Sequence, residues 1–234
     1  MDLKKQDVAE LLTVSINTID QFIQEGKIPF YTLEGEFRFN RQEIENWMMS
    51  ALASEKDILP FGEGPGESGP WQQFGLYRAI HKGAVVLNAN ETEKNAIIRE
   101  TMEKVSNKLS LDPEAVTDLL MERENLMPTS FNYGIAVPHT REFLLNGLFD
   151  AVVIVYPKEP IEWGALDQTP VNTLFFLFAC DDKRHLNLLA KIAHFTSSKK
   201  CLDFIQTHPE KAELLDFIKD WEESIIPRET ASVF

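Results

Sequence analysis

At 234 residues the chain is long enough for one large domain or two smaller ones, and 44% hydrophobic residues can build a core. The net charge of −14 keeps such a chain soluble and opposes nucleic-acid binding through bulk charge. The most apolar segment, Val171 to Cys180, has the length of a strand, and the charged N-terminus lacks the apolar stretch of a signal peptide, so we expect no membrane insertion. Cys180 and Cys201 have no partners at zinc-ligand spacing. We therefore expect reduced core thiols, no bound metal and a cytoplasmic location.

A segment rich in glycine and proline divides the chain. Residues 60 to 75 hold three prolines and five glycines, and no hydrophobic period continues through them. Glycine beside proline breaks both helix and strand. The sequence therefore predicts an N-terminal domain over residues 1–50, a Gly/Pro-rich linker over 51–75 and a C-terminal domain over 76–234.

The first 50 residues show two helical patterns followed by a hairpin. Apolar residues from Val8 to Leu12 recur at helical spacing, and Ser15 is placed to cap a second helix. Two short strands are expected on either side of Glu34-Gly35, and a third helix should follow Asn40. This order is typical of a small winged helix-turn-helix domain.

Short motifs across residues 3–49 add a family resemblance. They are Val8-Ala9-Glu10-Leu11-Leu12, Val14-Ser15, Thr18-Ile19, Gly26-Lys27-Ile28-Pro29, Arg38-Phe39 and Glu43-Ile44 followed by Trp47. With these motifs the segment resembles the excisionase/MerR-type DNA-binding domain, which implies DNA as a partner. The side chains that would contact DNA are Asn17 and Gln21 for adenine, and Lys27, Arg38 and Arg41 for phosphates.

The charge of the same segment opposes that role. Residues 1–50 hold five basic residues against nine acidic ones, and the expected recognition helix, Ser15 to Glu25, has no lysine or arginine. A DNA-binding protein takes most of its affinity from phosphate neutralisation. Two interpretations therefore stay open, namely sequence-specific DNA binding and a helix-turn-helix fold used for partner binding or for a homodimer.

The C-terminal domain alternates strand and helix patterns. Strands are expected over residues 84–87, 129–137, 151–156 and 173–179, and helices from Thr92, from Asp112 to about Asn125, and over 185–197, 202–205 and 212–221. Asp112 followed by Pro113 is a strong helix start. The continuous apolar runs are typical of central strands covered on both faces. The order predicts an α/β domain built in layers.

Four groups of residues, in order along residues 76 to 222, resemble one family. They are Met121-Glu122-Arg123-Glu124-Asn125; Gly134-Ile135-Ala136-Val137-Pro138-His139; Pro160-Ile161-Glu162-Trp163-Gly164-Ala165-Leu166-Asp167 with Pro170-Val171; and His185-Leu186 with Leu188-Leu189-Ala190. They resemble the enzyme IIA type-2 domain of the bacterial phosphotransferase system, the fructose/mannitol/nitrogen class. The resemblance implies a mixed sheet flanked by helices, as in the mannitol-type enzyme IIA. It also implies phosphoryl transfer from the histidine phosphocarrier protein to the histidine of the Pro-His motif, without a cofactor.

The chemistry of the motif residues fits this activity. An imidazole with an ordinary pKa of about 6.5 is nucleophilic and mostly uncharged at neutral pH, which suits His139 as the phosphoryl acceptor. By resemblance Arg123 would bind the phosphate, His185 would be the second active-site histidine, and Thr129 would supply a nearby hydroxyl. The residues alone also allow plainer roles, such as a surface ion pair for Arg123 and a helix-start position for His185.

One loop departs from the family pattern. Where the family has Ser-Thr-Gly-hydrophobic-Gly, this chain has Pro128-Thr129-Ser130-Phe131-Asn132, followed by Tyr133. The loss of two glycines removes backbone freedom there and puts the efficiency of phosphorylation in question.

The sequence therefore predicts a regulatory phosphocarrier with a helix-turn-helix domain. Two alternatives keep the IIA domain functional. One is a transcription regulator whose IIA domain is a sensor, and the other is a sugar-permease component that donates phosphate to a separate IIB protein. A degenerate binding module without phosphorylation is the last alternative.

Overall fold

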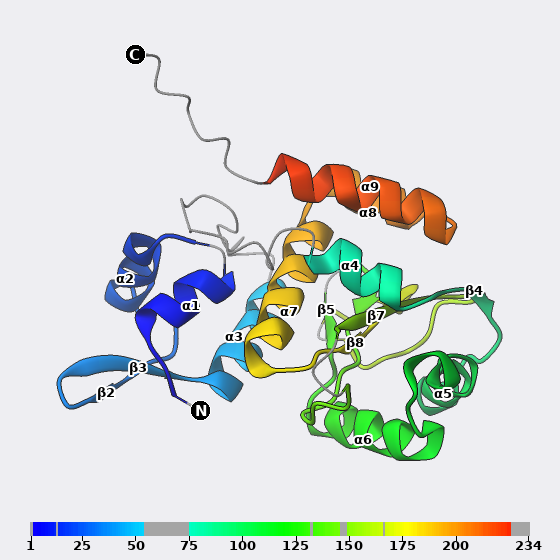
Figure 1. Ribbon diagram of the computed structural model, residues 1–234, viewed down its shortest axis with the longest axis horizontal. Coiled ribbons are helices and arrows are strands. Elements are labelled where there is room, and N and C mark those ends of the chain that lie inside the picture. Colours follow the sequence, from blue (N-terminus) through cyan, green and yellow to red (C-terminus); the bar gives the residue numbers. More distant parts are fainter. Residues whose placement is uncertain are drawn as a thin grey trace, which may run out of the picture.

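The computed structural model describes residues 2–12, 14–53, 75–131, 133–145, 149–165 and 167–225. Two domains lie side by side in it, with the N-terminal one at the left of Figure 1. The expected linker, residues 51–75, falls almost wholly outside the described residues. The last helix of the first domain continues to Ala53, and the next described helix begins at Gly75. Within the described part of the chain, no helix is both long and apolar enough to cross a membrane.

The N-terminal domain has the expected helix-turn-helix with a hairpin. Its elements are β1 (Asp2–Leu3), α1 (Lys5–Leu12), α2 (Ile16–Gln24), β2 (Tyr31–Leu33), β3 (Glu36–Asn40) and α3 (Arg41–Ala53). Ser15 caps α2, since its hydroxyl accepts a hydrogen bond from the Thr18 N–H at 3.1 Å. Glu34 and Gly35 form the hairpin turn with positive φ. The sequence did not predict β1, which makes the sheet three-stranded in the order β1-β3-β2.

The C-terminal domain is a mixed sheet flanked by helices, as expected. Its elements are α4 (Gly75–Lys82), β4 (Val85–Ala89), α5 (Lys94–Leu109), α6 (Pro113–Leu126), β5 (Ser130–Phe131), β6 (Ile135–Ala136), β7 (Ala151–Pro157), β8 (Thr173–Phe178), α7 (Asp182–Ser197), α8 (Lys199–Ile205) and α9 (Lys211–Ser224). The strand order is β4-β7-β8-β6-β5, in which β4–β7 and β8–β6 are parallel pairs while β7–β8 and β6–β5 are antiparallel. Helices α5 and α6 cover one face, and α4, α7 and α9 cover the other (Figure 1).

Three expectations for this domain need correction. The single strand predicted over residues 129–137 is a hairpin, β5 and β6, because Tyr133 and Gly134 take positive φ and turn the chain. Helix α5 starts at Lys94 and not at Thr92, while α7 starts at Asp182, three residues before His185. Helix α4 was not predicted. The two cysteines are free thiols as expected, Cys201 buried and Cys180 only half-buried.

The two domains share one hydrophobic core. Ile44 and Met48 of α3 are fully buried in the same cluster as Phe131 of β5 and Leu186 of α7. Helix α1 packs on α7, and α3 packs on both α7 and β5. The N-terminal domain therefore lies directly over the end of β6 and the start of α7, where the residues of the predicted site converge.

Candidate functional site

His139 lies where the sheet ends. Pro138 and His139 continue the line of β6 beside β8, with the Leu177 N–H donating to the Pro138 carbonyl at 2.9 Å. The ring is buried, with 1% of its surface exposed, and its Nδ1 lies 2.7 Å from the Val137 carbonyl oxygen. Because a carbonyl can only accept, Nδ1 carries the hydrogen of that bond. The ring orientation is thereby fixed, and Nε2 is the nitrogen that faces the other side chains of the site.

Arg123 and His185 meet His139 from two helices. Arg123 near the end of α6 is 2% exposed, and its Nη1 donates to the Met127 carbonyl at 3.0 Å. The ring of His185, in the first turn of α7, stands edge-on to that of His139 with 5.0 Å between centroids. The structure thus brings together three of the four predicted site residues. The surface ion pair considered for Arg123 is wrong, because its side chain is buried.

The fourth predicted residue, Thr129, is buried beside the site and directed elsewhere. Its hydroxyl and its backbone N–H both donate to the carboxylate of Glu124, the backbone bond being 3.1 Å long. Trp163 donates to the same carboxylate through Nε1 at 2.9 Å. Burial raises the pKa of Glu124, and the bonds from Thr129 oppose that rise. Glu124 therefore joins α6 to the loop before β5, a role that its place beside Arg123 in the sequence did not indicate.

A carboxylate from the N-terminal domain completes the site. Glu45 of α3 is 2% exposed, and its Oε1 lies 3.0 Å from His139 Nε2 and 3.1 Å from Arg123 Nη2. Its Oε2 lies 3.6 Å from His185 Nε2. Burial alone would raise the pKa of Glu45, but the hydrogen bond from His139 and the nearby His185 hold that pKa far below its usual range. Glu45 is therefore an anion inside the site.

Sequence reasoning missed Glu45. It stands between Ile44 and Asn46 in the helix-turn-helix motif, and an acidic residue on such a helix is ordinarily solvated. No pattern in the sequence signals that it crosses to the other domain.

Comparison with known proteins now identifies the C-terminal domain. Residues 78–221 match the family described as phosphoenolpyruvate-dependent sugar phosphotransferase system, EIIA 2. The chain belongs to this EIIA type-2 family. Residues 3–51 match a helix-turn-helix domain, which confirms the domain type expected for the N-terminal segment.

Relatives of the EIIA domain include proteins named nitrogen regulatory protein. The one from Pseudomonas aeruginosa is 27% identical over 149 residues, which is 62% of this chain and 95% of that protein. The one from Escherichia coli K12 is 32% identical over 123 residues, 51% of this chain and 74% of that protein.

Solved structures show the same fold. The nitrogen regulatory protein IIA-Ntr from Neisseria meningitidis superimposes with a TM-score of 0.52 at 24% identity, over 58% of this chain and 92% of that one. A putative IIA domain from Streptococcus pyogenes gives a TM-score of 0.53 at 16% identity, over 62% of this chain and 95% of that one.

The candidate site also contains carboxylate and imidazole groups, which are common metal ligands in other proteins. Among the described residues, Glu45, His139 and His185 offer ligand atoms that all lie within 4.8 Å of one another. Arg123 donates to Glu45 Oε1 at 3.1 Å, and a guanidinium so close repels a divalent ion. The positive charge of Arg123 therefore disfavours a metal at this cluster.

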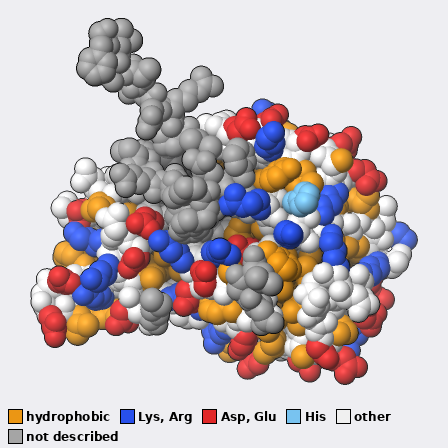
Figure 2. Space-filling model, viewed as in Figure 1, with side chains coloured by type: hydrophobic (Ala, Val, Ile, Leu, Met, Phe, Trp, Pro, Cys, Tyr) orange, Lys and Arg blue, Asp and Glu red, His pale blue; other side chains and the backbone are white. Residues whose placement is uncertain are grey.

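The residues considered for DNA binding lie outside the EIIA site. Asn17 and Gln21 are exposed on α2, while Lys27 pairs with Glu25 at 2.9 Å and Arg38 pairs with Glu36 at 2.6 Å. In the view of Figure 2, basic and acidic side chains are intermixed over the N-terminal domain.

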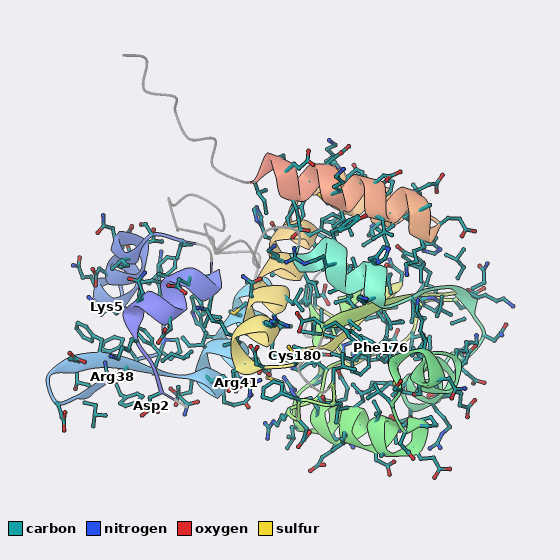
Figure 3. All side chains as sticks on the ribbon, in the orientation of Figure 1. Asp2, Lys5, Arg38, Arg41, Phe176 and Cys180 are labelled. Atoms are coloured by element: carbon teal, nitrogen blue, oxygen red, sulfur yellow. The ribbon has the colours of Figure 1, made fainter. Side chains whose placement is uncertain are left out.

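Arg41 differs from the other candidates for DNA contact. It forms an ion pair of 2.6 Å with Asp182 of α7 and lies over the ring of Phe143. Figure 3 shows it between the two domains, well away from Arg38 on the hairpin. In this conformation Arg41 binds the EIIA domain and is not available for a phosphate of DNA.

Proposed function

We propose that His139 accepts a phosphoryl group on Nε2 from the phosphohistidine of the histidine phosphocarrier protein. The observation that carries the proposal is the fixed ring. Its Nδ1 is held by the Val137 carbonyl, and its Nε2 lies 3.0 Å from Glu45 Oε1, the same oxygen that accepts from Arg123, with the His185 ring edge-on beside it. In the transfer, the Nε2 lone pair forms a new bond to phosphorus as the bond to the donor imidazole breaks. The donor nitrogen keeps that electron pair.

Arg123, His185 and Thr129 each have a role in that transfer. The guanidinium of Arg123 is always charged and binds phosphoryl oxygens at the end of α6. Burial lowers the pKa of His185 to about 4, so its ring is neutral at ordinary pH and can donate one N–H to a phosphoryl oxygen. Thr129 acts indirectly, because with Glu124 it fixes the loop that leads into the hairpin and His139.

The output we infer is regulation. An EIIA domain joined to a helix-turn-helix domain, with relatives named nitrogen regulatory protein, fits a chain whose phosphorylation state is sensed by a partner. Donation to a separate IIB protein is the main alternative, and phosphate transfer to such a protein in a reconstituted relay would favour it. DNA binding through exposed Asn17 and Gln21 is the second alternative. A chain that binds no genomic fragment at low salt, phosphorylated or not, would exclude it.

The proposal predicts one acid-labile phosphoryl group per chain. The full chain would be incubated with phosphoenolpyruvate, enzyme I and the histidine phosphocarrier protein, and its intact mass then measured. The wild type should gain one phosphoryl group and His139→Ala none, because the acceptor nitrogen is gone. The half-buried His194 lies outside the site, so His194→Ala serves as the matched control and should be phosphorylated. Phosphate on His139→Ala, or none on the wild type, would contradict the assignment.

A further inference from the structure

The carboxylate of Glu45 occupies the place that a phosphoryl group on His139 would take. Its Oε1 lies 3.0 Å from Nε2 and 3.1 Å from the Arg123 guanidinium, between the nucleophile and the cation proposed to bind phosphate. A carboxylate presents negatively charged oxygens to a guanidinium as a phosphoryl group does. Glu45 contacts both His139 and Arg123 directly, and the three residues are each no more than 2% exposed.

We propose that the helix-turn-helix domain is an intramolecular ligand of the phosphorylation site, with Glu45 as the phosphoryl mimic. The domain and the phosphoryl group then compete for His139 and Arg123. This inference rests on the function proposed above, because it concerns the regulation of the same site.

The bond from Glu45 blocks the nucleophile. Nδ1 donates to the Val137 carbonyl, so the only nitrogen left for attack is Nε2. The 3.0 Å hydrogen bond between Nε2 and Glu45 Oε1 engages that nitrogen, so its lone pair is not free to attack phosphorus while Glu45 is in place. In-line attack also needs phosphorus within about 3.5 Å of Nε2, on the side where Glu45 now lies. Helix α3 must therefore withdraw before transfer.

Contacts outside the site hold the N-terminal domain in this position. Arg41 pairs with Asp182 at 2.6 Å, and Glu10 of α1 pairs with Lys183 at 2.6 Å. Between these ion pairs, Ile44 and Met48 are buried in the shared core. The packing of α1 and α3 against the EIIA domain therefore fixes the position of Glu45 beside His139.

Phosphorylation should separate the α1 and α3 face of the N-terminal domain from the EIIA domain. A phosphoryl group adds a charge of about −1.5 to −2 where a buried carboxylate already lies, and Arg123 cannot neutralise both. By reciprocity, whatever holds the helix-turn-helix domain away from the EIIA domain should favour phosphorylation at equilibrium by the same coupling free energy. It should also speed the transfer, because a larger fraction of the chains then has His139 open to the donor. The closed chain is the unphosphorylated state, and the open chain exposes the α1 and α3 face to partners.

The test compares initial rates of phosphorylation of four full-length chains by the same phosphorylated donor. Glu45→Gln keeps the shape of the side chain and removes its charge. Arg41→Gln weakens domain docking by breaking the ion pair with Asp182, and leaves His139, Arg123 and Glu45 in place. Exposed Glu43→Gln on the same helix is the matched control. Both test variants should be phosphorylated faster than the wild type, by about tenfold for Glu45→Gln. The control should match the wild type, and circular dichroism with thermal unfolding confirms that each chain is folded.

The outcomes separate this inference from the function on which it rests. Faster transfer in both test variants supports the intramolecular ligand. Equal rates in all four chains, with phosphate on His139, would overturn the ligand and leave the phosphocarrier intact. If no chain gains phosphate from a donor that phosphorylates a separate EIIA protein, the phosphocarrier function itself fails, and its regulation with it.

Discussion

At His185, burial and the charge of Glu45 shift the pKa of the ring in opposite directions. Desolvation lowers the pKa of the ring and the nearby Glu45 carboxylate raises it, while His139 and Arg41 lower it further, and the result is a pKa of about 4. In the unfolded chain the ordinary value is 6.5. As pH falls below 6.5, the unfolded state therefore binds a proton that the folded state excludes, and stability is lost between 6.5 and about 4.

The corresponding prediction concerns stability against pH. The free energy of unfolding should fall between about pH 7 and about pH 5, with His185 contributing about 2 kcal/mol of that fall. Glu45 adds a further loss below its ordinary pKa of 4.5, because its folded pKa is depressed. Urea unfolding at several pH values, on the wild type and on His185→Gln, measures the slope. An equal slope in the two proteins would show that His185 is not held neutral.

The residues of the site differ in how far the sequence could reveal them. His139, Arg123 and His185 lie in motifs that resemble the family, and the structure brings all three together. Glu124 is within the same motif, but its direction depends on how α6 packs on Trp163. Glu45 could not be foreseen, since it belongs to another domain and its partner atoms lie 78 and 94 positions further along the chain.

Among the elements, α4 depends on a residue from the far end of the chain. The carboxylate of Glu222 in α9 accepts hydrogen bonds from the N–H groups of Leu76 and Tyr77, at 3.1 and 2.9 Å, and from the ammonium of Lys191. Such a carboxylate satisfies the free donors of a helix start. No local capping residue precedes α4 in the sequence, and Gly75 falls in the segment expected to be a linker, so hydrophobic patterning alone does not predict this helix.

Removing that carboxylate should be costly. Glu222→Ala leaves the buried Lys191 ammonium and two backbone donors without this acceptor, for which we expect a loss of about 3–5 kcal/mol in the free energy of unfolding. The exposed neighbour Glu223→Ala should change it by less than about 0.5 kcal/mol. Urea unfolding of both variants measures the difference. A Glu222→Ala chain as stable as Glu223→Ala would show that α4 is capped in some other way.

Across the whole molecule, the sequence predicted the two domains and their fold types but not how they pack. Hydrophobic periods report which face of an element is buried, and not which domain buries it. Ile44 is expected from the sequence only on the third helix of a small domain, and in the structure it and Met48 are also part of the core shared with α7. The docking of α3 on the EIIA site follows from this long-range packing. The inference that the N-terminal domain controls access to His139 depends on the same packing.

The most direct test of the account is hydrogen exchange, followed by mass spectrometry, on the full chain before and after phosphorylation. Amides of α3 and of the first turn of α7 should exchange faster once His139 carries phosphate, because Glu45 leaves the site and the domains separate. The His139→Ala chain, treated identically, should show no change. Unaltered protection of α3 in a fully phosphorylated chain would contradict the claim that the phosphoryl group and Glu45 exclude each other.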